Sequence, residues 1–183
     1  SYFHYLRIYG TSNSYLYCSG GGTLDVNSHF YIRSGVTFHS HGYTMYVGDN
    51  FYDYGTFDHD NNTVYLDTAN DGYIYGSPTF YRLRLTKSGS GDWMRIASNV
   101  TTYYLYLDEG RFRHDYSSYT MTIHYYVYCY AGAEYYQTTG TTNITYYDFN
   151  NRNGELDMRG GTMNINRHLY NNNGYSSNRM YVS

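Results

Sequence analysis

Apolar residues in this chain occur as pairs two positions apart, and the pairs recur about every nineteen residues from one end to the other. Residues two apart lie on one face of a β-strand, so each pair predicts a short strand with one buried side. A fixed period of this length is typical of repeat architectures. The pairs are Leu6/Ile8, Leu24/Val26, Met45/Val47, Val64/Leu66, Leu83/Leu85, Leu105/Leu107, Met121/Ile123, Ile144/Tyr146, Met163/Ile165 and Met180/Val182.

The pattern predicts an all-β fold, a single-stranded β-solenoid (parallel β-helix) of about ten rungs of about 19 residues. Between the apolar pairs stand clusters of Gly, Asn, Asp and Ser, which turns require. None of these clusters is long enough to be a linker, so residues 1–183 are expected to form one domain. Tyr43-Thr44-Met45 recurs as Tyr119-Thr120-Met121, which predicts an internal duplication of a four-rung block of roughly 76 residues.

Composition excludes some functions. The chain has 12 basic and 15 acidic residues, a net charge of −3, and Lys87 as its only lysine. Binding to nucleic acid depends on neutralising phosphates, so we expect no nucleic-acid partner. No apolar run reaches the length of a transmembrane helix, so we expect no membrane insertion. The first residue is Ser1, which indicates that a leader was removed or that the sequence is a fragment.

The two cysteines, Cys18 and Cys129, lie several rungs apart in a solenoid, beyond the reach of a disulfide. We expect two free, half-buried thiols.

The chain holds 30 tyrosines and one proline. Many tyrosines stand at the alternate, outward positions of the predicted strands, such as Tyr46, Tyr65 and Tyr106. The exterior is therefore expected to be aromatic, and a row of exposed rings can bind sugars by stacking.

The densest groups of metal-binding side chains are His39-Ser40-His41 and Asp58-His59-Asp60. His39 and His59 are about one rung apart, so we expect them to stack at roughly the 4.8 Å strand spacing. Imidazole with carboxylate suits zinc or copper. Both groups flank turn residues, however, which favours solvated loops. We therefore expect no metal site, with His39, His41 and His59 as weak candidates.

No motif indicates an enzyme or a cofactor. A phosphate-binding glycine loop, a nucleophilic triad and a Cys-x-x-Cys motif are all missing from the sequence. Its carboxylates are scattered over different rungs without a recognisable pairing, unlike those of glycosidases. Three Asn-x-Thr sequons, at Asn61, Asn99 and Asn143, are candidate glycosylation sites.

Four stretches read as solenoid repeats: Ser34-Gly35-Val36-Thr37-Phe38, Gly42-Tyr43-Thr44-Met45, Asn50-Phe51-Tyr52-Asp53-Tyr54-Gly55-Thr56-Phe57 and Gly76-Ser77-Pro78-Thr79-Phe80-Tyr81-Arg82-Leu83. They resemble the β-helical repeats of secreted bacterial surface and adhesin-type proteins. The resemblance implies an extracellular or cell-surface location and carries no catalytic signature. The chain departs from that family where tyrosine stands at outward positions at which Thr, Asn and Ser are expected.

The apolar pattern begins at Phe3, Leu6 and Ile8 and continues to Met180 and Val182. We expect these residues to form open strand edges, and edge-to-edge stacking without closure grows a fibre. The leading hypothesis is a structural subunit of an extracellular filament, sheath or surface fibre, a head-to-tail homopolymer with glycans as a second expected partner. The alternatives are a fragment of a β-helical adhesin and a tyrosine-rich carbohydrate-binding module.

Overall fold

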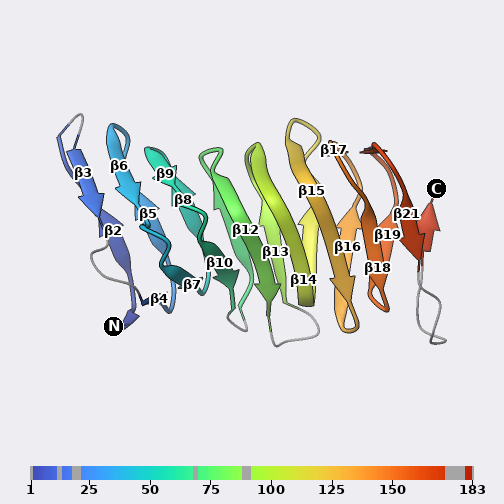
Figure 1. Cartoon of the computed structure of the whole chain (residues 1–183), viewed down its shortest axis with the longest axis horizontal. Coiled ribbons are helices and arrows are strands. Elements are labelled where there is room, and N and C mark those ends of the chain that lie inside the picture. The colour runs from blue at the N-terminus through green and yellow to red at the C-terminus, as the bar shows by residue number, and fades with distance from the viewer. Residues whose placement is uncertain are drawn as a thin grey trace.

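The protein is an all-β, parallel β-solenoid of about seven turns with a spacing of about 21 residues. Its computed structural model describes residues 2–11, 14–17, 22–67, 70–87, 92–171 and 180–182. Strands follow one another along the long axis, from the N-terminal to the C-terminal end (Figure 1). They are β1 (Tyr2–Phe3), β2 (Leu6–Ile8), β3 (Ser14–Tyr17), β4 (Thr23–Val26), β5 (Phe30–Ile32), β6 (Val36–His39), β7 (Thr44–Val47), β8 (Phe51–Asp53), β9 (Thr56–Asp58), β10 (Thr63–Leu66), β11 (Gly72–Tyr75), β12 (Thr79–Thr86), β13 (Trp93–Ile96), β14 (Val100–His114), β15 (Thr120–Tyr130), β16 (Ala133–Gln137), β17 (Thr141–Ile144), β18 (Phe149–Arg152), β19 (Glu155–Met158), β20 (Thr162–Ile165), β21 (Leu169–Asn171) and β22 (Met180–Val182).

Parallel pairing between successive turns arranges these strands in three ladders. The first ladder runs through β1, β4, β7, β10, β12, β14 and β15, and then divides into β17–β20 and β18–β21. The second runs through β2, β5, β8, β11, β13, β14, β16, β19 and β22. The third contains β3, β6 and β9. The long strand β14 belongs to two ladders.

The predicted fold class is confirmed, and the structure explains why the apolar pairs outnumber the turns. Leu105 and Leu107 pair with Val127 and Cys129, not with Met121 and Ile123 as the even spacing suggested. The pairs Leu6/Ile8 and Met180/Val182 belong to the second ladder, whereas most of the others belong to the first. Ten pairs therefore do not form one column.

The interior of the N-terminal turns is a stack of phenyl rings. Phe51 lies between Phe30 and Phe80, with ring centroids 5.1 and 4.9 Å away. Phe38 and Phe57, from the third ladder, stack on each other at 6.2 Å and approach the same group. All five side chains are buried. Alternation of apolar and polar residues places them inside, because successive side chains of a strand point to opposite faces.

The interior of the C-terminal turns contains polar groups that bond to one another. The Tyr135 hydroxyl lies 2.7 Å from Thr142 Oγ1, and Thr142 donates to Gln137 Oε1 at 2.8 Å. His114 Nδ1 lies 3.1 Å from the same Thr142 oxygen, and its Nε2 lies 3.0 Å from the carbonyl of Tyr119. Burial lowers the pKa of His114, which keeps the ring neutral.

Two further buried groups are a lysine and a cysteine. Lys87 is fully buried, and its Nζ donates to the carbonyl of Gly48 at 3.1 Å and to that of Asn70. Cys129 is a free, buried thiol, and burial raises its pKa to about 12. The other cysteine, Cys18, lies outside the described residues.

Among the described residues the structure contains no helix with the length and apolarity needed to cross a membrane.

Candidate functional site

A bend in the first ladder gathers tyrosines on the outside of the molecule. In β14, Tyr103 and Tyr104 both point outward between the buried residues Thr102 and Leu105. The register with β15 shifts at this point, between Thr102 and Tyr104. An extra residue in one strand of a pair bends the strand and re-aims its side chains. In β15 three successive residues, from His124 to Tyr126, are half-exposed in the same way.

The bend borders an open groove of about 460 Å³. Tyr125 is central to it, with its ring 5.8 Å from Tyr103, 6.0 Å from Tyr146 and 5.7 Å from Tyr147. The guanidinium of Arg167 lies 4.8 Å from the centroid of the Tyr147 ring. We call this site the aromatic groove; its lining residues are Tyr103, His124, Tyr125, Tyr146, Tyr147 and Arg167.

A flatter column of stacked rings runs beside the groove on the first ladder. Tyr46 and Tyr65 stack at 4.6 Å with an interplanar angle of 10°. The guanidinium of Arg84, on the next turn, lies 5.4 Å from the Tyr65 ring and 5.1 Å from the Tyr106 ring. Tyr106 in turn stacks on Tyr128 at 5.3 Å. The expected aromatic exterior is thus an ordered surface in which each turn places a ring or a cation on the next.

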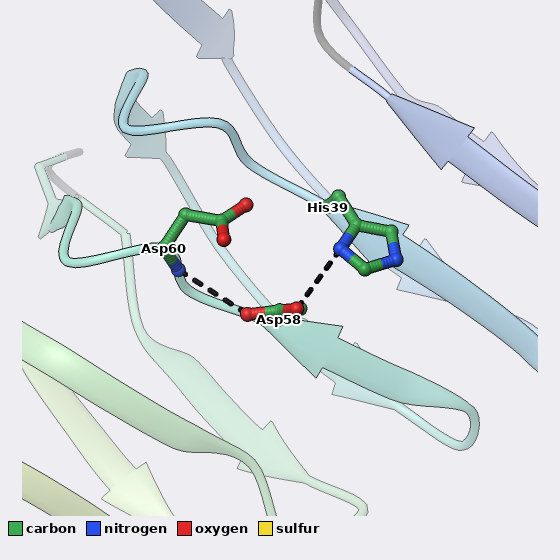
Figure 2. A group of neighbouring side chains, drawn as sticks. All are labelled: His39, Asp58 and Asp60. Atoms are coloured by element: carbon green, nitrogen blue, oxygen red, sulfur yellow. Dashed lines mark hydrogen bonds and ion pairs between the residues drawn. The ribbon is translucent and has the colours of Figure 1, made fainter.

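A second candidate site lies at the edge of the third ladder, where His39, Asp58 and Asp60 converge (Figure 2). One ligand atom from each of these side chains lies within 4.8 Å of the others. His39 Nδ1 is 2.9 Å from Asp58 Oδ2. Asp60 Oδ2 accepts a hydrogen bond of 2.9 Å from the backbone N–H of His41.

The histidine candidates are arranged differently from the expectation. His39 is in register with Asp58 and not with His59, because β6 and β9 are related by 19 residues rather than 20. The ring of His59 instead lies near Tyr81, at 5.9 Å, and burial lowers its pKa. The His41 ring is close to the cluster, 6.2 Å from that of His39. The expected stacking of His39 on His59 is therefore wrong.

Another group of carboxylates, Glu134, Glu155 and Asp157, lies on the second ladder. Arg111 pairs with Glu134 at 2.5 Å, and Arg159 pairs with Asp157 at 2.8 Å. Guanidinium groups therefore balance two of the three carboxylates in this group.

The three sequons are in different environments. Asn61 is exposed in a turn, with a positive φ of 60°. Asn99 is also exposed, and its Oδ1 accepts a bond of 2.9 Å from the backbone N–H of Thr120. Asn143 lies in β17, where its Oδ1 accepts a bond of 2.8 Å from the Asn164 amide.

The residues predicted as assembly edges are also placed differently from one another. Phe3 is exposed in β1, Leu6 is half-buried, and Ile8 is buried in the core. Met180 and Val182, in β22, pair in register with Leu156 and Met158.

The aromatic groove is not among the sites predicted from the sequence, although the sequence carries a signal for it. The dipeptides Tyr103-Tyr104, Tyr125-Tyr126 and Tyr146-Tyr147 recur at intervals of about one turn. Two adjacent large side chains break the alternation expected of a strand, and such a break indicates a bulge.

Comparisons of the chain with protein-family models, with curated proteins and with solved structures found no match.

Proposed function

We propose that the protein is an extracellular β-solenoid that binds glycan chains along its aromatic face. The observation that carries this proposal is the aromatic groove, in which four tyrosines from three successive turns surround an open volume of about 460 Å³. Tyrosine presents an apolar ring face and a polar hydroxyl, which suits the alternating apolar and hydroxylated surfaces of a sugar. Arg167 and His124 add hydrogen-bond donors at the same site.

Charge favours a glycan over a nucleic acid as the occupant. Aromatic platforms also bind single-stranded nucleic acids, but these proteins combine the platform with a positively charged groove. Here the net charge is −3, and among the described residues Arg167 is the only arginine or lysine that lines the groove. Resemblance to repeats of secreted bacterial surface proteins and the exposed sequons at Asn61 and Asn99 support the proposed location.

Binding to insoluble and soluble glycans tests the proposal. A pull-down with cellulose and chitin, and titrations with soluble glucan and uronate polymers, should detect binding by the full chain. Tyr125→Ala should weaken it about 2- to 10-fold, the equivalent of the roughly 0.5–1.5 kcal/mol of a stacked aromatic contact. Tyr54→Ala is the control, because Tyr54 is also an outward tyrosine and, at 48% exposure, more exposed than Tyr125, but follows a strand of the second ladder. Equal losses in both variants, or tighter binding to single-stranded DNA than to any glycan, would contradict the proposal.

A second candidate function is end-to-end assembly with further copies of this chain. It is favoured by an apolar hollow of about 250 Å³ beside the last turns, lined by Leu156, Met158, Gly160, Gly161, Met163, Ile165 and Leu169. At the other end of the described coil Phe3 is 40% exposed. The first and second ladders are parallel and reach both ends of the described coil, so a second copy placed head to tail would continue these two, and such heterologous contacts build fibres.

Negative-stain microscopy and sedimentation of the 183-residue chain test this second function. Filaments are expected for the unmodified chain and should shorten or disappear in Leu169→Glu, which places a charge in the hollow. Tyr116→Glu is the control, since Tyr116 is as exposed as Leu169, at 38%, but does not line the hollow. Dispersed particles of the unmodified chain at high concentration would rule out assembly and would leave glycan binding unaffected.

A further inference from the structure

We propose that His39, Asp58 and Asp60 form a binding site for a divalent transition-metal ion, with zinc as the best match. The inference is independent of the glycan and assembly proposals, because none of these three residues lines the aromatic groove or the apolar hollow. It rests on the convergence of one imidazole and two carboxylates from adjacent turns (Figure 2).

The backbone holds the three ligands in place. His39 ends β6 and Asp58 ends β9, and the parallel pairing of these strands sets the two side chains opposite each other. Asp60 follows in a turn with a positive φ of 42°, which directs its carboxylate back toward the other two side chains. The three ligand atoms lie within 4.8 Å of one another. Only small side-chain movements would therefore bring them to the bond lengths of about 2.0–2.2 Å that zinc forms.

Neighbouring groups orient the ligands, as outer-shell partners do in known metal sites. The His41 N–H bonds to Asp60 Oδ2, which leaves the other carboxylate oxygen of Asp60 for an ion. The His39 ring stacks flat on Tyr17 at 4.5 Å with an angle of 9°, which restrains the plane of the imidazole. The His41 ring, 6.2 Å from that of His39, is within reach as a fourth ligand.

This cluster differs from the group of Glu134, Glu155 and Asp157 in how its carboxylates are paired with cations. Glu134 and Asp157 are paired with arginines, so two of the three carboxylates in that group are already balanced. Within the described ranges, neither Asp58 nor Asp60 forms an ion pair with an arginine or lysine. A divalent ion would balance the two carboxylates. The imidazole favours zinc over calcium, which takes oxygen ligands.

Calorimetric titration of the full chain with zinc chloride tests the site. We expect about one zinc per chain and a higher melting temperature with excess zinc, since a ligand that binds only the folded state stabilises it. Asp60→Asn and His39→Gln should each weaken zinc binding at least 10-fold. The matched control is His168→Gln, because His168 pairs with Asp148 at 3.2 Å and no third ligand joins them among the described residues.

A spectroscopic readout on the unmodified chain keeps the test decisive if a variant does not fold. Zinc should shift the imidazole resonances of His39 in the NMR spectrum and leave those of His168 in place. Absence of zinc binding, zinc binding that survives both substitutions, or equal shifts at His39 and His168 would overturn the proposal. Tighter binding of calcium than of zinc would overturn the choice of a transition metal.

Discussion

The N-terminal and C-terminal turns share one backbone plan but have different interiors. Around Phe51 the core consists mainly of phenyl rings packed closely on one another. Around Thr142 the core contains an imidazole, an amide and a phenol, each within hydrogen-bonding distance of the Thr142 hydroxyl. A parallel ladder therefore accepts either kind of interior, provided that each polar group finds a partner.

The two interiors are sensitive to different changes. Phenyl packing depends on volume, so a loss of atoms leaves a cavity whose cost grows with its size. The polar interior depends on pairing, because a buried group that loses its partner keeps the full cost of leaving water. We expect volume changes to be most harmful in the N-terminal turns and polarity changes most harmful in the C-terminal turns.

The largest effect is expected from Phe51→Ala in the phenyl stack. Phe51 is fully buried between two other rings, so its removal should lower the free energy of unfolding by about 3–5 kcal/mol. Urea unfolding measures the change. Phe51→Leu is the control and should cost clearly less because it retains most of the volume. Similar losses in both variants would show that the stack does not depend on volume.

The next largest effect is expected in the pH dependence of stability, which Asp53 causes. This residue is buried in the N-terminal turns, and burial raises its pKa from 3.8 to about 6, although the backbone N–H groups of Phe57 and Gly55 partly oppose this shift. The folded state therefore binds the proton more tightly than the unfolded state does. Its contribution to stability is complete below about pH 4 and is lost as the pH rises through about 6.

A pKa raised from 3.8 to about 6 corresponds to a contribution of roughly 3 kcal/mol. Urea unfolding at several pH values should show this loss in the unmodified chain, and Asp53→Asn should remove that part of the pH dependence. An unchanged pH profile in the variant would mean that Asp53 does not carry the effect.

The smallest of the three effects is expected from Thr142→Val in the polar interior. The substitution preserves shape but removes the oxygen that Tyr135, His114 and Gln137 share. Stability should fall by about 1–3 kcal/mol, the cost of leaving a buried group unpaired. Thr37→Val, an outward threonine of the third ladder, should change stability by less than about 0.5 kcal/mol. Equal effects in the two variants would remove the distinction between the interiors.

The sequence alone determined the class of fold and most of the faces. Alternation at pairs such as Val64/Leu66 predicts a strand with one buried side, and this physics is local, because neighbouring side chains of a strand must point in opposite directions. The sequence also predicted an aromatic exterior, which the structure shows where Tyr46 stacks on Tyr65.

The tertiary structure decided the register, and with it the candidate sites. The number of residues in each turn varies, so the partner of Leu105 is Val127 and the partner of His39 is Asp58, neither of which an average period predicts. A slip of one residue exchanges the two faces of a strand, so only the packed interior selects the correct pairing. The convergence of His39, Asp58 and Asp60 depends on that selection, as does the grouping of tyrosines around the aromatic groove.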